Sequence, residues 1–249
     1  MSNAAETANA LDAMLNHWRA KHQPDLVNVG YAEDPQADKL VREDLFAFLL
    51  ACSIDRTGKS TLIWNIPCKL SLDWGHIDPC TISRMSPEEL ASNPIIAHAP
   101  GQVSREQIAK TIISLAQVVT DDYSGHPERI LDGSISDVMD NLQQVSGIGP
   151  NIARMIIILR ILYFGLKPAR TGRLLPKIDV HVTRVMTRTG AVQDGSEHSL
   201  LKALRHYPVE DIAAIDQVCW EIGQTFCRPH EPDCRDCPLN DCCAKVGVG

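Results

Sequence analysis

The sequence lacks the features that mark membrane and secreted proteins. No stretch approaches the roughly 20 uninterrupted apolar residues that a transmembrane helix needs. The N-terminal segment has no basic start followed by an apolar run, so we expect no secretory signal and a cytoplasmic location. Internal repeats and low-complexity segments are also missing, and alternating strand-like runs are scarce.

The chain also lacks an excess of basic residues. Its 249 residues include 24 Lys and Arg against 31 Asp and Glu, which gives a net charge of −7. Taken as a whole, this balance argues against a protein that coats nucleic acid by bulk charge. Residues 141–190, however, hold eight bases and one acid, a charge of +7 that leaves −14 for the rest of the chain. This uneven distribution is typical of a surface that binds a nucleic-acid backbone locally.

Helical periodicity is abundant. Apolar residues recur at helical spacing, and Ser86 and Ser104 stand where N-caps are expected. The pattern predicts an all-α fold, with helices at 5–22, 38–51, 58–72, from 86, 104–119, 136–145, 150–164, 180–189, 196–206 and 208–226.

Two glycines, Gly147 and Gly149, lie in the turn between the helices expected at 136–145 and 150–164. Backbone N–H groups can converge at such a turn because no side chain shields them. The free N–H groups and the positive dipole end of the second helix face the same place, which suits a phosphate oxygen. A plain tight turn would explain the same glycines, but the surrounding basic segment favours a phosphate site.

Asp179 is the only acid in the basic segment, and it stands at the start of a predicted helix. An aspartate in this position is most often an N-cap. A carboxylate that faces a basic groove could also stabilise a cationic sugar or activate a water. Both interpretations are open from the sequence alone.

Nine cysteines in a reducing compartment indicate metal or thiol chemistry rather than disulfides. Cys227, Cys234, Cys237 and Cys243 form a Cys-x6-Cys-x2-Cys-x5-Cys tail, enough for a tetrahedral metal ion or an iron–sulfur cubane. Cys242 could substitute for its neighbour, although the spacing favours Cys243. The residues alone leave zinc and iron–sulfur open.

The hairpin, the Ile-Asp-Val-His-Val-Thr-Arg-Val segment around Asp179 and the cysteine tail, in this order, resemble the endonuclease III superfamily of helix-hairpin-helix DNA glycosylases. The resemblance is good over residues 134–243 and looser back to residue 38. Residues 55–67 look more like a divergent bacterial branch than like endonuclease III itself.

The resemblance implies a monomeric enzyme that flips a damaged or mismatched base out of double-stranded DNA and hydrolyses its N-glycosidic bond. It implies two helical domains with a DNA cleft between them: a six-helix barrel at 38–165, with the helix-hairpin-helix at 142–164, and a domain of 1–37 plus 166–249. Asp179 would be the catalytic carboxylate, and the cysteines of the 227–243 loop would bind a [4Fe–4S] cluster. The DNA-binding residues would be Gly147, Ile148, Gly149, Asn151, Arg154 and Arg184.

The sequence also departs from the family pattern. Asn151 stands where bifunctional members carry a Schiff-base lysine, which predicts a monofunctional glycosylase. Residues 166–175 form a basic insert near the expected pocket. Ser53, Asp55 and Arg56 are candidate base-pocket residues, with a helix-capping turn as the equal alternative.

Two further functional hypotheses are open. Lys177 or Lys59 could replace the missing lysine in a glycosylase with lyase activity. Alternatively, the scaffold could have lost its chemistry and serve as a non-catalytic, DNA-binding or redox-sensing iron–sulfur protein.

Overall fold

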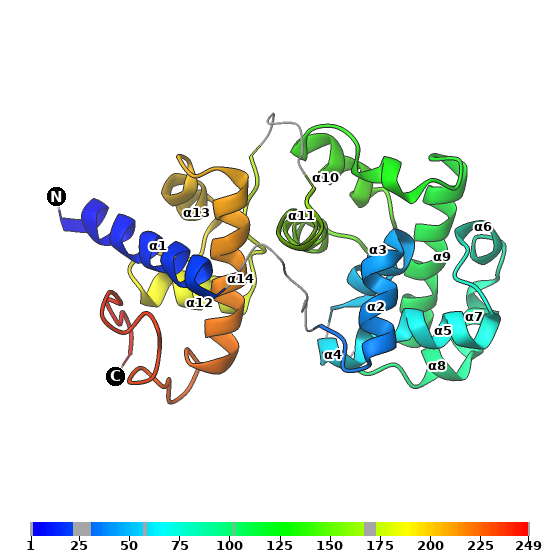
Figure 1. The fold of residues 1–249 in the computed structure, drawn as a ribbon, viewed down its shortest axis with the longest axis horizontal. Helices are drawn as coiled ribbons and strands as arrows, with labels where there is room; N and C mark the ends of the chain where they lie inside the picture. The colour runs from blue at the N-terminus through cyan, green and yellow to red at the C-terminus, as the bar shows by residue number, and fades with distance from the viewer. Residues whose placement is uncertain (1, 22–30, 57–58, 102, 167–172, 249) are drawn as a thin grey trace. The chain divides into compact units, whose positions relative to one another are not determined.

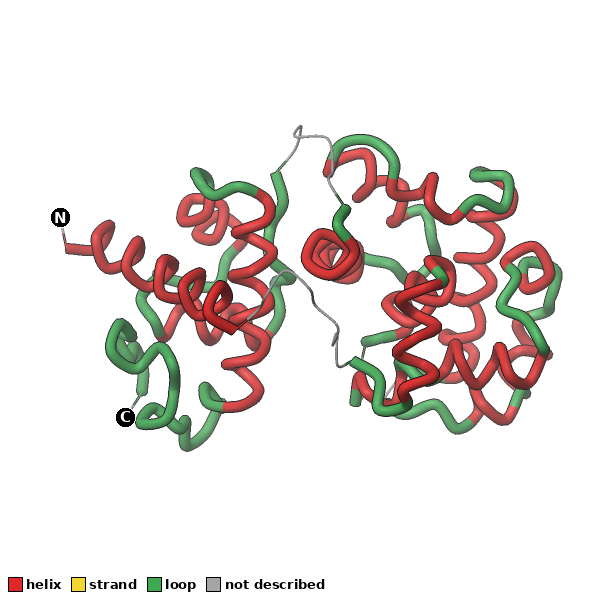
Figure 2. Tube along the Cα trace, in the orientation of Figure 1, coloured by secondary structure: helices red, strands yellow, loops and turns green. Residues whose placement is uncertain are grey.

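The computed structural model describes residues 2–21, 31–56, 59–101, 103–166 and 173–248, with side chains from residue 9 onward. Within these ranges the regular structure is entirely helical, and no β-strand occurs (Figure 2). The predicted all-α fold class is therefore confirmed. In the described part of the chain, no helix combines the length and the apolar character that crossing a membrane requires.

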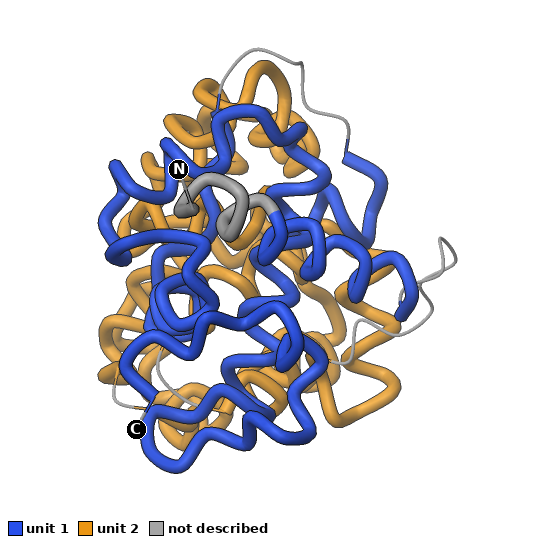
Figure 3. The backbone as a smooth tube through the Cα atoms, turned by 90° about the vertical axis from the view of Figure 1, so that its left-hand side faces the viewer, with its two compact units in different colours: residues 1–26, 158–166, 173–249 blue, residues 27–157, 167–172 orange. Residues whose placement is uncertain are grey.

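The chain divides into two compact units, coloured separately in Figure 3. Unit 1 comprises residues 1–26, 158–166 and 173–249, and unit 2 comprises residues 27–157 and 167–172. Helix α11 (Pro150–Phe164) runs from one unit into the other, so the division falls inside a helix that the sequence assigned to the barrel alone.

Unit 2 is built around α3 (Leu45–Ile54), which is buried on nearly all sides and contacts α2, α5 and α9. A helix that is apolar all round belongs in a core, and the run from Leu45 to Ile54 has that character. The other elements of this unit, labelled in Figure 1 where there is room, are α2 (Pro35–Glu43), α4 (Ser60–Ile63), α5 (Ile66–Trp74), α6 (Pro79–Ile82), α7 (Pro87–Ser92), α8 (Pro94–Ala97), α9 (Arg105–Asp121), the 3-10 helix η1 (Pro127–Leu131), α10 (Ile135–Gln143) and the first half of α11.

The sequence predicts single helices at 38–51 and 58–72, and both predictions are wrong, because the structure has two helices in each range. Asp44 ends α2 and caps α3, accepting a hydrogen bond from the Ala47 N–H at 2.9 Å, so the helix predicted at 38–51 is two helices. The helix predicted at 58–72 is divided near Asn65, and Pro67 stands in the first turn of α5, where a missing N–H costs nothing.

Unit 1 is organised by α14 (Val209–Thr225), whose long buried face packs against α1 (Ser2–Lys21) and α12 (Val180–Arg188). The remaining elements are α13 (Glu197–Leu204) and the second half of α11. From α1, Leu11, Met14 and Leu15 are buried, as the sequence periodicity predicts. This packing fixes α12, and with it Asp179, on α14.

Candidate functional site

The hairpin at 145–150 connects α10 to α11 in unit 2. The Ile148 N–H donates to the Val145 carbonyl at 3.0 Å, and the Ser146 N–H donates to the Ser114 hydroxyl at 2.8 Å. Ile148 itself is 4% exposed, so its side chain anchors the turn while Gly147 and Gly149 remain exposed. Around the two glycines, the hairpin therefore presents backbone groups and the start of α11 to a ligand.

The two hairpin glycines are required for different reasons. Gly147 has a φ of +96°, and a Cβ there would collide with the Arg56 guanidinium and the Thr111 hydroxyl. Gly149 lacks a positive φ, and a Cβ there would meet no described atom within 4 Å. Gly147 is thus a folding requirement, whereas a side chain at Gly149 would only obstruct the space outside the hairpin.

Arg56 lies directly beneath the hairpin. Its Nη2 donates to the Thr111 hydroxyl at 2.9 Å, and its Nε donates to the Ser53 carbonyl at 3.2 Å. Burial lowers the pKa of this guanidinium, because removing a cation from water disfavours its charge. The positive charge sits against Gly147, where it would favour an anion bound at the hairpin.

Ser53 and Asp55 have the contacts of a helix end. Ser53 is fully buried, with its hydroxyl donating to the Leu50 carbonyl at 2.8 Å. The Asp55 carboxylate accepts hydrogen bonds from the Trp64 indole at 2.9 Å and from the Ser60 hydroxyl at 3.1 Å. Asp55 is also the C-cap of α3 through its backbone N–H, and the role of these residues in a base pocket stays a prediction.

On the first turn of α11, the Arg154 guanidinium donates to the Asn151 amide oxygen at 3.5 Å. Asn151 is half-buried and lies beside this cation. By the resemblance drawn from the sequence, it stands where bifunctional glycosylases carry the Schiff-base lysine. An amide in this place cannot form an imine.

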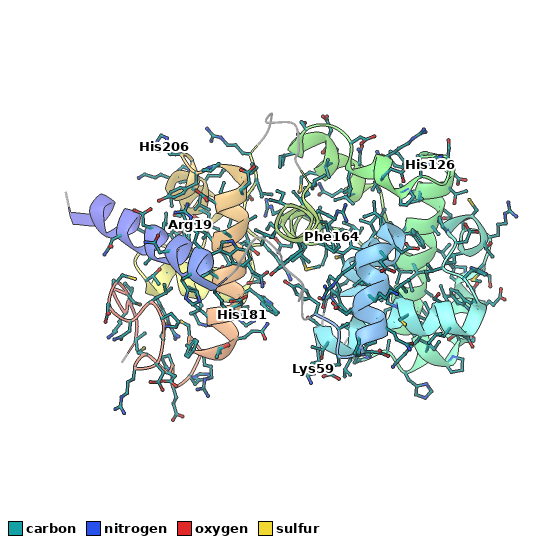
Figure 4. All side chains as sticks on the ribbon, viewed as in Figure 1. Arg19, Lys59, His126, Phe164, His181 and His206 are labelled. Carbon is teal, nitrogen blue, oxygen red and sulfur yellow. The ribbon has the colours of Figure 1, made fainter. Side chains whose placement is uncertain are left out.

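Asp179 begins α12 in unit 1. Its Oδ1 accepts hydrogen bonds from the N–H groups of His181, labelled in Figure 4, at 2.8 Å and of Val182 at 3.0 Å, so it is an N-cap. Its Oδ2 lies 3.8 Å from Lys177 Nζ, and the carboxylate side chain keeps 18% of its surface exposed. One oxygen thus serves the helix while the other faces an amine near the surface.

A second carboxyl, which the sequence interpretation missed, lies next to this turn. Asp216 on α14 is 7% exposed and accepts a hydrogen bond from the Lys177 N–H at 2.5 Å. Burial raises the pKa of Asp216 to about 7, and the Lys177 N–H opposes part of that rise. The available signal was an acid inside the mostly apolar run Ile-Ala-Ala-Ile-Asp-Gln-Val.

Arg184, a predicted DNA contact, binds backbone carbonyls. Its guanidinium donates to the carbonyls of Cys227 at 2.6 Å, of Gly223 at 2.8 Å and of Val180 at 3.0 Å. In this structure the side chain ties α12 to the end of α14 and to the first cysteine of the tail. A phosphate would have to compete with these three acceptors.

The cysteine tail forms a loop around one cavity. Cys227, Cys234, Cys237 and Cys243 all line it, together with residues of α12 and α14, and Cys242 does not. Burial raises the pKa of Cys237 and Cys243, and the neighbouring Cys227 and Cys234 add to that rise. The four predicted cysteines therefore line the same cavity, and their role as cluster ligands stays a prediction.

This donor set fits a group held by four thiolates. Within the described ranges, no set of three or more His, Cys, Asp or Glu side chains is arranged to hold a metal ion. A cubane cluster requires a wider spacing of its ligands than a single metal ion does. Each thiolate binds a different iron atom, so the four cysteine sulfurs stay apart. Arg188 Nη1 lies 3.6 Å from Cys227 Sγ and also donates to the Arg228 carbonyl, which holds the loop in place.

Comparison with known proteins gives both sequence and fold relatives. No family model matches the chain. Endonuclease III of Thermotoga maritima is 25% identical over 138 residues, 55% of this chain and 56% of that protein. Endonuclease III homolog 1, chloroplastic, of Arabidopsis thaliana is 28% identical over 120 residues, 45% of this chain and 29% of that protein. The matches thus span about half or less of these relatives.

Solved structures match over nearly the whole chain. An endonuclease III–DNA covalent intermediate has a TM-score of 0.64 at 20% identity and covers 97% of this chain and 96% of its own. The chain has an endonuclease III-like fold. A thermostable thymine-DNA glycosylase gives a TM-score of 0.66 at 15% identity, with 98% of both chains covered. The endonuclease III-like resemblance drawn from the sequence is confirmed, and the TM-scores, at these low identities, establish the fold alone.

Proposed function

We propose that this endonuclease III-like chain is a DNA glycosylase of base-excision repair that removes damaged or mismatched bases from double-stranded DNA. The observation that carries the proposal is the carboxylate of Asp179, held rigidly by a helix cap with Oδ2 left facing Lys177 near the surface. The sequence likeness to endonuclease III over half the chain supports it. Such an enzyme works as a monomer on the nucleoid, in the cytoplasm.

The proposed reaction is hydrolysis at C1′ of a flipped nucleotide. The bond from C1′ to the base nitrogen breaks, the electron pair leaves with the base, and positive charge develops on the sugar. The Asp179 carboxylate stabilises that charge, and a water oxygen then bonds to C1′ and releases a proton. Because the cap orients the carboxylate before substrate arrives, no reorganisation is needed during the reaction.

Water is the proposed nucleophile because Asn151 replaces the family's Schiff-base lysine. The Asn151 amide contacts Arg154 on the first turn of α11. It contributes to DNA binding there and cannot bond covalently to the sugar.

DNA is held at the hairpin. The backbone around Gly147 and Gly149 and the N-terminus of α11 bind one phosphate, with Arg56 adding positive charge from beneath. The site depends on these groups because the chain as a whole is acidic.

The cysteine loop carries a [4Fe–4S] cluster in this proposal, held by Cys227, Cys234, Cys237 and Cys243. When bound, the cluster crosslinks the tail to α12 and α14, as metal sites do for small folds. Arg184 and Arg188 already make the same connection through hydrogen bonds to the loop.

Asp179→Asn tests the proposal. Asparagine caps helices about as well as aspartate, so α12 should persist while the negative charge is lost. Single-turnover excision on a panel of lesion-containing duplexes should fall by on the order of 100-fold or more. The matched control is Asp194→Asn, another acid whose carboxylate accepts a backbone N–H, from Ser196 at 2.9 Å. Excision that persists unchanged in Asp179→Asn would leave only the capping role.

A second candidate function is lyase activity through Lys177. Its Nζ is 3.8 Å from Asp179 Oδ2, so a primary amine is present at the proposed reaction centre. An attack of that amine on C1′ of an abasic sugar, with loss of water, gives an imine. Lys59, the other lysine that the sequence suggested, is ion-paired with Glu33 at 2.8 Å in unit 2 and is labelled in Figure 4.

Borohydride trapping on an abasic duplex separates the two functions. A covalent adduct of the wild type that disappears in Lys177→Gln and persists in Lys59→Gln would establish the lyase. If the wild type excises bases but gives no adduct, the enzyme is monofunctional.

A further inference from the structure

Asp216 is an acid where packing alone would select an apolar residue. It lies in the middle of the buried face of α14, with Ile215 fully buried before it and Gln217 at 4% exposure after it. Burying a carboxyl is unfavourable unless hydrogen bonds compensate for the lost hydration. Its presence therefore requires an explanation in its contacts.

Those contacts lead to Asp179 in two steps. Asp216 Oδ1 accepts the Lys177 N–H at 2.5 Å, and the Lys177 carbonyl accepts the Asp179 N–H at 2.8 Å. The turn 177–179 is thus fixed to α14 at the residue before the cap. Without the Asp216 acceptor, the Lys177 N–H would lose this hydrogen bond in a half-buried position.

The titratable groups around Asp216 also influence one another electrostatically. Among the described residues, Lys177 and Asp179 act on Asp216 from the turn, and Cys219 is its titratable neighbour on α14. Burial raises the pKa of Asp216 to about 7, so its proton is lost near neutral pH. The negative charge beside Lys177 and Asp179 then increases by one.

We propose that Asp216 is the positioning residue of Asp179: its carboxyl anchors the Lys177–Asp179 turn to α14, and its ionisation adds negative charge beside the reacting sugar. This inference rests on the proposed glycosylase function. The ionised form should be the more active one, because it accepts the Lys177 N–H more strongly and favours a developing cation. Asp216 does not touch substrate in this scheme and acts through Asp179.

The test is the pH profile of single-turnover excision for the wild type, Asp216→Asn and Asp216→Ala. The wild-type rate should rise on the order of tenfold between about pH 6 and about pH 8. A tenfold change corresponds to an interaction of about one pKa unit between the Asp216 charge and the developing charge on the sugar. Asp216→Asn keeps the acceptor but cannot ionise, so its profile should be flat near the low-pH rate. Asp216→Ala should be slower at every pH. Asp211→Asn, on the same helix but in a surface pair with Arg19, should follow the wild type. A rise with pH that persists in Asp216→Asn overturns the inference.

A second measurement does not depend on activity. Carbon NMR of aspartate-labelled protein should show the Asp216 carboxyl titrating near neutral pH, with the Asp179 signal shifting at the same midpoint. In Asp216→Asn the Asp179 response should vanish. An Asp179 signal that ignores the titration refutes the positioning role, whereas the absence of excision by a wild type that shows this coupling refutes only the glycosylase function.

Discussion

Replacing Asp216 with asparagine should stabilise the protein at neutral and alkaline pH. Burial raises the pKa of this carboxyl from 3.8 to about 7, so the folded state keeps a proton that the unfolded chain has already released. Stability then falls as the pH rises from the lower value to the higher, because the folded state binds more protons. At 1.36 kcal/mol for each pKa unit, the loss above neutral pH reaches about 4 kcal/mol.

Urea unfolding at about pH 5 and about pH 8 measures this effect. The added amide hydrogens of asparagine have the same cost at both pH values, so the difference between the two conditions isolates the titration. Relative to the wild type, Asp216→Asn should gain about 2 to 3 kcal/mol between them. Asp211→Asn, whose partner Arg19 is on the surface, should change by less than about 1 kcal/mol. An unchanged pH dependence of the free energy of unfolding in Asp216→Asn would refute the reasoning.

Three further predictions concern the hairpin and the tail. Gly147→Ala should cost about 1 to 3 kcal/mol of unfolding free energy in urea titrations, from positive φ and the displaced Arg56, whereas Gly149→Ala should weaken DNA binding without that loss. Arg56→Gln should flatten the slope of log affinity against log salt by about one, as measured by fluorescence anisotropy. Cys243→Ser should lower the iron content and the visible absorbance of the purified protein, whereas Cys242→Ser, outside the cavity, should retain both.

Much of the fold follows from local patterns in the sequence. Periodicity and caps predict α9 and α14 with small errors at their ends, because these signals lie within one or two turns. The division of 38–51 at Asp44 was missed because apolar residues continue on both sides of it. The extended backbone of Asp44 and the hydrogen bond from the Ala47 N–H to its carboxylate show that a new helix begins there.

The candidate site was predictable where its parts are contiguous. The hairpin, the Asp179 cap and the cysteine spacing are each contained in a short segment. Arg56 beneath Gly147 and Asp216 beneath Lys177 are contacts between distant segments, and no local pattern reveals them. Of the basic insert, residues 167–172 lie outside the described residues, so its expected place near the pocket stays a prediction.

The proposed combination of a capping and a catalytic role in Asp179 also bears on how such a protein can evolve. An aspartate codon becomes an asparagine codon by one base change, and asparagine would still accept the His181 and Val182 N–H groups. A descendant with that change should fold, keep its hairpin and bind DNA, yet leave every base in place. Under the proposed function, one mutation at the cap would therefore convert a repair enzyme into a protein that recognises damage without removing it.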